Sequence, residues 1–169
     1  MENKIKEKPM PTIKRNHHFV FIEAPIALVF PEIVSWGEAA WWPKKSDMKF
    51  VKKTEGDVAV GTRYVQKVKG AFAPHWVVEV SKIVPNKLIE RTFKTGMFRG
   101  YEVVKLEERS NGTRVDYEML YFINGFINKF MWSFKFKEKH DENLKLILAT
   151  MQETILTKQK ENQEKELEG

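Results

Sequence analysis

Arg91 and Glu102 are the two residues of this chain whose types and spacing most directly suggest chemistry. Arg91 lies in the run 87–94, where Ile89 and Phe93 occupy the alternate positions. Because successive side chains of a β-strand point to opposite faces, Arg91 shares the apolar face of this predicted strand. A buried arginine needs a partner, and Glu102 is the available carboxylate across the next turn. The two residues therefore form either an internal salt bridge or an anchor for an anionic ligand group.

Tyr117 and Tyr121 add hydroxyl groups to the same predicted interior. They alternate with Val115 and Met119 on one face of the run 113–123, opposite a charged face. In small-molecule sites, a few polar groups in an otherwise apolar pocket orient the ligand. The alternative is a solid core in which the tyrosine hydroxyls find backbone partners. If the chain is an enzyme, these tyrosines and Arg91 are the acid-base and electrophile candidates, but they match no catalytic motif.

Metal and cofactor chemistry receive little support from the residues. The chain has no cysteine and four histidines scattered along it. His17 and His18 are neighbours on a predicted strand, so their rings point to opposite faces and do not share a metal. His140 and Asp141 read as part of a solvated charge run. HExxH, GxSxG, P-loop and GxGxxG motifs are all absent from the sequence. We therefore expect no metal and no cofactor.

Length and composition indicate one globular domain of 169 residues with 42% apolar residues. The formal net charge is +6, but the basic residues are mostly lysine and are interleaved with 23 acids. No dense arginine stripe results, which argues against nucleic acid as the partner. The first 16 residues show no secretory signal, and residues 121–136 are too polar to span a membrane, so we expect a cytoplasmic protein. The oligomeric state is not indicated.

The middle of the chain alternates with period two and is punctuated by turn residues. Asn111-Gly112 is a strong hairpin signal, and Pro85-Asn86 marks another turn. Such a succession indicates an antiparallel meander. Before it, Ala24-Pro25 starts one short helix, and residues 35–42 are predicted as a second, with Ser35 as its N-cap. The predicted strands are residues 15–23, 48–53, 62–69, 75–84, 87–94, 98–108 and 113–123.

A long amphipathic helix is predicted from Gly125 to about Lys160, and it is preceded by strands that form a sheet. Its apolar residues recur at steps of three and four, which places them on one stripe. Such a stripe needs a large concave surface to cover. The predicted order is therefore βααββββββα, with the helix closing a cavity against the sheet. The stripe consists of Phe126, Ile127, Phe130, Met131, Phe134, Leu144, Ile147, Leu148, Met151 and Ile155.

Four local segments and their order resemble the START-like, or SRPBCC, superfamily, in particular its polyketide cyclase/dehydrase branch. The segments are 21–30 (FIEAPIALVF), 60–63 (VGTR), 111–115 (NGTRV) and 142–145 (ENLK). The resemblance covers about residues 14–155. It implies an α+β helix-grip fold, in which a seven-stranded antiparallel sheet wraps around a long C-terminal helix. It also implies binding of hydrophobic or amphipathic small molecules, or cyclase activity, but supplies no universal catalytic residues.

The leading hypothesis is a protein that binds a lipid-like or aromatic, polyketide-like molecule between the sheet and the C-terminal helix. The alternative is a cyclase or dehydrase acting on an aromatic or polyketide-like substrate. Trp41 and Trp42 serve either as core packing or as a lid at the mouth of the cavity. The expected cavity-lining residues are Trp42, Tyr64, Gln66, Trp76, Val78, Arg91, Glu102, Tyr117, Met119, Tyr121, Phe130 and Phe134.

A third reading concerns the segment from Phe126 to Lys139, in which aromatic residues alternate with lysines on more than one side of a helix. This pattern fits either an anionic membrane surface or a partner groove, or aromatic residues that simply cover neighbouring loops. We divide the chain into an extended or disordered leader at 1–13, one START-like domain at 14–157 and a charged helical tail at 158–169.

Overall fold

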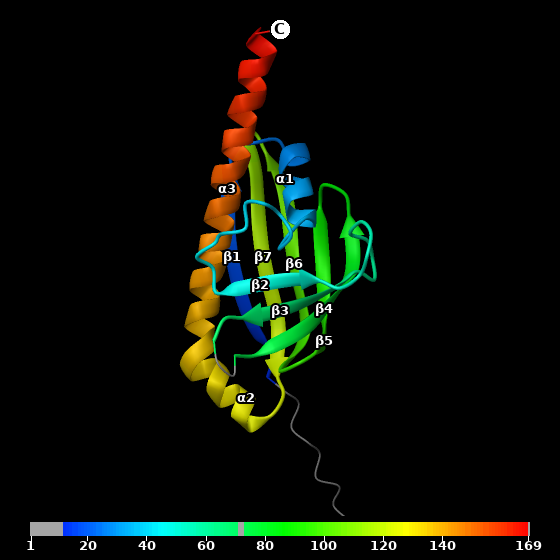
Figure 1. The fold of residues 1–169 in the computed structure, drawn as a ribbon, viewed down its shortest axis with the longest axis vertical. Helices are drawn as coiled ribbons and strands as arrows, with labels where there is room; N and C mark the ends of the chain where they lie inside the picture. Colours follow the sequence, from blue (N-terminus) through cyan, green and yellow to red (C-terminus); the bar gives the residue numbers. More distant parts are fainter. Residues whose placement is uncertain (1–11, 71–72, 169) are drawn as a thin grey trace, which may run out of the picture.

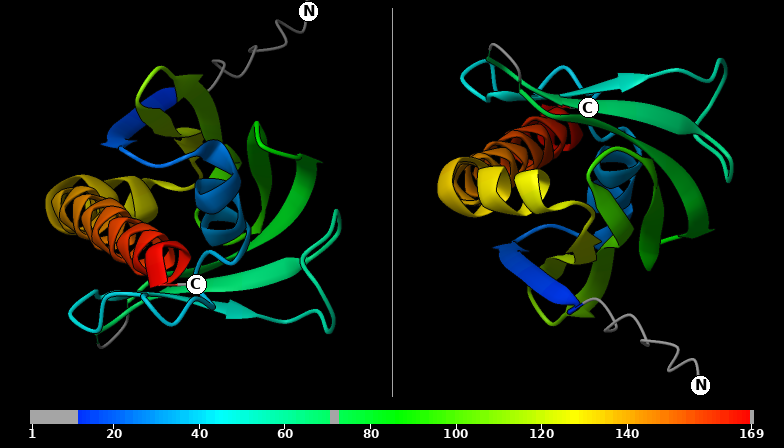
Figure 2. Two further views of the ribbon diagram at one scale, coloured as in Figure 1. Left: turned by 90° about the horizontal axis from the view of Figure 1, so that it is seen from above. Right: turned by 90° about the horizontal axis from the view of Figure 1, so that it is seen from below.

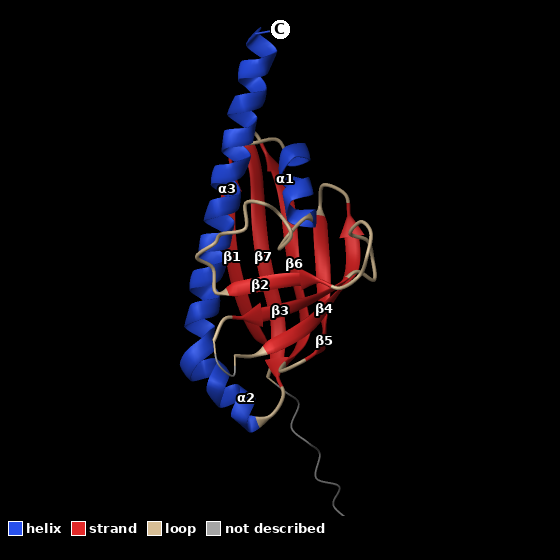
Figure 3. Ribbon diagram, viewed as in Figure 1, coloured by secondary structure: helices blue, strands red, loops and turns tan. Residues whose placement is uncertain are grey.

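The protein is described by a computed structural model that covers residues 12–70 and 73–168 (Figures 1 and 3). Residues 1–11 of the predicted leader and Gly169 of the predicted tail lie outside these ranges. Seven strands are followed by a helical segment with two α-helices and a π-helical turn between them. The elements are β1 Lys14–Ile22, α1 Ile26–Val34, β2 Met48–Lys52, β3 Arg63–Val68, β4 His75–Val84, β5 Leu88–Thr95, β6 Phe98–Arg109, β7 Gly112–Ile123, α2 Phe126–Met131, the π turn Trp132–Phe136 and α3 Lys137–Glu168.

The seven strands form one antiparallel sheet in the order β1-β7-β6-β5-β4-β3-β2. Only the pairing of β1 with β7 departs from the meander. The sheet curls around α3, so that its two edges approach the helix from opposite sides (Figure 2). Each predicted strand lies within one residue of an observed one at both ends. The predicted fold class, a seven-stranded sheet wrapped around a long C-terminal helix, is therefore confirmed.

The second short helix predicted at residues 35–42 is wrong. Gly37 has a φ of +88°, which is incompatible with a continuing α-helix. The hydroxyl of Ser35 bonds back to the carbonyl of Glu32 at 3.2 Å, so it ends α1 rather than capping a new helix. Successive turns follow, with the amide of Trp42 bonded to the carbonyl of Ala39 at 3.0 Å. We call the irregular segment 35–47 the tryptophan loop.

The C-terminal helical segment carries the predicted apolar stripe only in its second part. Leu144, Ile147, Leu148, Met151 and Ile155 are buried against the sheet, with exposed fractions of 3% or less. The first part is different, and the physical reason is the π turn, which accommodates one more residue than an α-helical turn. One extra residue rotates everything before it by about 100°. The residues that the prediction placed inside but the structure exposes are Phe126, Ile127, Phe130 and Phe134.

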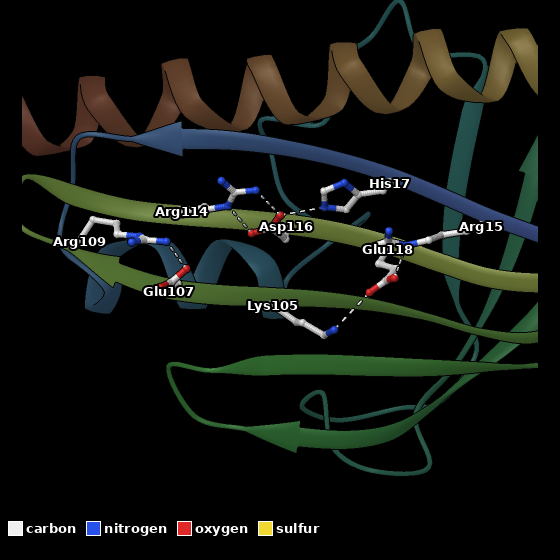
Figure 4. Close-up of polar contacts among 8 residues, drawn as sticks. All are labelled: Arg15, His17, Lys105, Glu107, Arg109, Arg114, Asp116 and Glu118. Carbon is white, nitrogen blue, oxygen red and sulfur yellow. Dashed lines mark hydrogen bonds and ion pairs between the residues drawn. The ribbon is translucent and has the colours of Figure 1, made fainter.

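The convex face of the sheet carries cross-strand ion pairs (Figure 4). Glu118 on β7 bonds to Arg15 on β1 at 2.6 Å and to Lys105 on β6 at 3.1 Å. Next to it, the ion-paired guanidinium of Arg114 holds the pKa of Asp116 below its usual value. Exposed pairs of this kind contribute little stability individually. They show which face of the sheet is outward and leave the opposite, concave face for the core.

A pair of substitutions on α3 tests whether this helix closes the sheet. We expect Leu148→Ala to lower the free energy of unfolding by about 2–5 kcal/mol, because it leaves a void under the helix. Lys145→Ala, on the exposed side of the same helix, should change it by no more than about 0.5 kcal/mol. Thermal melting of both variants in one buffer measures the difference. Equal, small shifts would mean that α3 does not pack on the sheet.

Candidate functional site

A buried polar cluster lies on the concave face of the sheet, centred on the carboxylate of Glu102. One oxygen, Oε1, accepts hydrogen bonds from Nε2 of Gln66 at 3.1 Å and from a terminal nitrogen of Arg91 at 3.4 Å. The other, Oε2, accepts one from the hydroxyl of Tyr117 at 3.0 Å. The indole of Trp76 donates in turn to the amide oxygen of Gln66. Strands β3 to β7 all contribute to this cluster, so its geometry depends on the whole sheet.

The strand register explains why these side chains meet. Arg91 on β5 lies directly opposite Glu102 on β6, and Glu102 lies opposite Met119 on β7. Paired residues of an antiparallel sheet point to the same face, so an inward Arg91 makes Glu102 point inward too. The exposed fractions of Arg91 and Glu102 are 0% and 2%. Sequence analysis left open an internal salt bridge or a ligand anchor at Arg91, and the structure shows the salt bridge with Glu102.

Among the residues that the structure describes, two polar atoms of this cluster have no hydrogen-bond partner. They are Nε of Arg91 and the hydroxyl of Tyr64, and both side chains are fully buried. The guanidinium lies 5.9 Å from the centre of the Tyr64 ring. The hydrogen bonds of its terminal nitrogens are long, at 3.4 Å to Glu102 and 3.5 Å to the carbonyl of Ile33. An unpaired buried donor costs about 1–3 kcal/mol, so these two atoms mark a place where an acceptor fits.

The tyrosines of the cluster stay protonated at neutral pH. Burial, and then the negative charge of Glu102, raise the pKa of Tyr117 well above its ordinary value. Burial also raises the pKa of Tyr64. Both hydroxyls therefore act as hydrogen-bond donors and not as phenolate bases. Within the described residues, no three Asp, Glu or His side chains are grouped closely enough to hold a metal ion.

The tryptophan loop covers this cluster with aromatic rings. Trp36 stacks on Tyr117, with ring centres 6.3 Å apart, and its edge contacts both Trp41 and Trp42. Gly37 is required here because a Cβ at this position would lie 2.2 Å from the Cβ of Phe50. Sequence analysis singled out Trp41 and Trp42 but overlooked Trp36, which makes the contact with the polar cluster. The sequence feature that could have indicated Trp36 is its position five and six residues before Trp41 and Trp42.

Side-chain hydrogen bonds hold the tryptophan loop in place at several points. The indole of Trp41 donates to Glu32 on α1 at 2.6 Å, and the indole of Trp42 donates to the carbonyl of Met48 at 3.0 Å. On α3, the amide oxygen of Asn143 accepts from the Ser46 hydroxyl at 2.8 Å. It also accepts from the backbone amide of residue 47 at 2.7 Å. The loop is thus attached to both helices that flank it.

The other predicted site residues separate into an apolar group and an exposed pair. Tyr121 is buried but belongs to a different contact, since its hydroxyl accepts from the indole of Trp132 at 3.0 Å. Val78 and Met119 are buried core residues. Phe130 and Phe134 are exposed, at 53% and 79%, and do not face the sheet, which corrects the predicted lining. Six of the candidates meet in or beside the polar cluster: Tyr64, Gln66, Trp76, Arg91, Glu102 and Tyr117.

His140 also differs from its predicted setting. It is 5% exposed and packs its ring against Trp132, with ring centres 5.4 Å apart. It therefore belongs to the interior and not to a solvated charge run.

The hollows that stand out in the structure lie on the surface, and none of them is lined by the twelve candidate residues. The most enclosed one, of about 210 Å³, lies between α1 and α3 and is lined in part by Leu28, Pro31 and Ile155. The space between the sheet and α3 is filled by side chains, above all by the rings of the tryptophan loop. A ligand of any size can reach the polar cluster only if this loop moves.

Substitutions at Glu102 test the role of the buried ion pair. Glu102→Gln leaves the charge of Arg91 buried without compensation, so we expect a loss of about 3–5 kcal/mol in the free energy of unfolding. Adding Arg91→Met to this variant removes the uncompensated charge and should recover part of the loss. Chemical denaturation measures all three forms. The control is Glu107→Gln on the outer face, with an expected change within about 0.5 kcal/mol. Similar effects of the two glutamine substitutions would contradict the assignment.

No protein-family profile matches the chain, and neither does any curated protein sequence. Solved structures, however, are similar over nearly its whole length. Norcoclaurine synthase from Thalictrum flavum superposes with a TM-score of 0.66 at 12% identity, covering 90% of this chain and 99% of that one. Ara h 8.0201 gives a TM-score of 0.63 at 13% identity, covering 86% and 99%. The protein TTHA0849 from Thermus thermophilus gives 0.61 at 17% identity, covering 86% and 98%.

At these identities the comparison concerns the fold alone. The similar structures include Bet v1-like proteins. The curled seven-stranded sheet and the long C-terminal helix correspond throughout. The chain therefore has the helix-grip fold in its Bet v1-like form.

Proposed function

We propose that the protein binds a hydrophobic or amphipathic small molecule between the sheet and α3. The observation that carries the proposal is the pair of unpartnered donors, Nε of Arg91 and the hydroxyl of Tyr64, inside an aromatic interior. Buried polar groups are almost always hydrogen-bonded, so two neighbouring exceptions indicate that a partner is missing. The aromatic walls suit an apolar body, and the two donors suit a polar acceptor on it.

The tryptophan loop is the part that must open. It has no regular secondary structure, and its polar attachment to the flanking helices consists of one hydrogen bond from Trp41 to Glu32, two from the loop to Asn143 and an ion pair between Asp47 and Lys139. Moving the loop would withdraw the ring of Trp36 from Tyr117 and leave a space of aromatic-ring size over the cluster. In this scheme the ligand stabilises an open form that is less populated in its absence.

The charge of the cluster favours a neutral polar group on the ligand. Glu102 already compensates Arg91, and a second carboxylate would bring two anions to one guanidinium in a dry interior. A carbonyl oxygen accepts hydrogen bonds without adding charge. A lipid-like ester or ketone, or an aromatic, polyketide-like carbonyl compound, meets this requirement. For the same fold, the Thalictrum flavum norcoclaurine synthase structure was obtained with dopamine and hydroxybenzaldehyde, which supports a small aromatic ligand here.

A cyclase- or dehydrase-type enzyme is the second candidate. The observation in its favour is that Arg91, Glu102 and Tyr117 converge, with a protonated tyrosine beside a carboxylate. Tyr121, the fourth residue that this hypothesis needs, bonds instead to Trp132. The convergence serves binding as well as catalysis, so we place the enzyme second.

Tyr64→Phe separates ligand binding from structural stability. The variant keeps the ring and loses a hydroxyl that has no partner in the protein, so thermal stability should stay the same or rise. Binding of Nile red, a neutral aromatic probe with a carbonyl group, should weaken about five- to thirtyfold, the equivalent of about 1–2 kcal/mol for one hydrogen bond. Fluorescence titration measures the dissociation constant.

Tyr121→Phe provides the matched control, because it removes a hydroxyl that the protein already uses. It should lower thermal stability and leave the Nile red affinity unchanged. Equal affinity of Tyr64→Phe and the parent protein, or the absence of saturable one-to-one binding, would overturn the proposal.

A further inference from the structure

The end of the molecule that carries α2 exposes a cluster of large apolar side chains. Phe126, Ile127, Phe130 and Phe134 are 84%, 76%, 53% and 79% exposed, and the rings of Phe130 and Phe134 lie 4.6 Å apart. We call these four residues the α2 aromatic face. Single exposed hydrophobic residues are common on protein surfaces, but a contiguous group of four marks an interaction site. Exposing these apolar side chains to water is unfavourable, so covering them would stabilise a complex with a partner.

The charge next to the α2 aromatic face is mostly positive. The sequence from residue 122 to 137 contains three lysines and no acidic residue, and the exposed Glu138 follows directly. Lys129 and Lys137 are both exposed, and Lys137 also pairs with Asp141 on α3 at 3.4 Å. A helix with aromatic residues on its outer face and lysines at its borders has the composition of segments that lie in the interface of anionic membranes. The charge thus selects an acidic partner.

The π turn that follows α2 attaches this segment to the body of the protein. Trp132 and Phe136 point inward, with exposed fractions of 1% and 7%. The indole of Trp132 bonds to Tyr121, and its ring meets that of Phe98 at 4.7 Å between centres. The π turn therefore presents one set of aromatic side chains to the core and another set outward. In Figure 1 the α2 end lies opposite the end from which α3 projects.

We propose that the α2 aromatic face docks the protein on the surface of an anionic lipid bilayer. The aromatic rings enter the boundary between headgroups and acyl chains, to a depth of about 5–10 Å, while the lysines contact the lipid phosphates. A second copy of this chain is a poorer occupant, because the two faces would carry the same positive charge. The proposal concerns a different surface from the ligand site and stands whether or not a small molecule binds inside.

Vesicle co-sedimentation tests this proposal with the full-length protein. Vesicles of phosphatidylcholine alone should bind it weakly, and vesicles with one third phosphatidylglycerol should bind it strongly. Raising the salt concentration should weaken binding, since the Debye length at physiological ionic strength is about 8 Å. Lys129→Gln with Lys137→Gln should lower the partition coefficient about fivefold per lysine. Phe126→Ser with Phe134→Ser should lower it at least tenfold.

Matched control variants show whether the effects belong to this face. Lys82→Gln with Lys87→Gln removes two exposed charges elsewhere, and Phe19→Ser with Val60→Ser removes two exposed apolar side chains from other strands and loops. Both should bind like the parent protein. Equal binding to both kinds of vesicle, or equal losses in the control variants, would overturn the proposal. So would a dimer that forms in solution and is abolished by Phe126→Ser with Phe134→Ser. None of these outcomes affects the Nile red titration, so the two proposals fail separately.

Discussion

The fully buried guanidinium of Arg91 is the constraint on which the concave face of the sheet depends. A charge in this position must be compensated, and the register between β5 and β6 supplies Glu102 as its direct neighbour. The carboxylate then organises Gln66 and Tyr117 around itself, and through Gln66 it fixes the indole of Trp76. A slip of one residue between these strands would turn one member of the ion pair to the outside. The polar cluster therefore specifies the register of the sheet.

The strands were predictable because each has one apolar and one polar face, and the turns between them carry glycine, proline or asparagine. The same alternation placed Arg91 and Tyr117 in the interior, whereas Glu102 was named because a buried arginine needs a carboxylate partner. The helical parts were less predictable. Gly37 interrupts a segment whose other residues suit a helix, and its necessity appears only from its contact with Phe50. The π turn has no sequence signature of its own, so an apolar stripe that looks continuous in the sequence divides into an inward and an outward part.

Sequence analysis identified the members of the site but not the state of its interior. It expected a cavity, and in the structure the rings of Trp36, Trp41 and Trp42 occupy the space above the polar cluster. Whether large side chains fill a concave sheet or leave room depends on where an irregular loop folds back, and periodicity carries no information about that. The donors left without partners, on Arg91 and Tyr64, are likewise a three-dimensional property. They can be found only when every buried polar atom is matched with its neighbours.

The π turn at Trp132–Phe136 holds one residue more than an α-helical turn. Because of this extra residue, Trp132 and Phe136 face inward while Phe130 and Phe134 face outward. Removing one residue here would give an ordinary α-helix and leave the residues on either side in their present phase. With the sequence unchanged, a continuous α-helix would instead place Phe130 and Phe134 on the same side as Leu148, facing the sheet. The geometry of this one turn thus decides which pair of aromatic residues is inside, Trp132 and Phe136 or Phe130 and Phe134, and a switch between the two geometries would display or withdraw the outer aromatic surface.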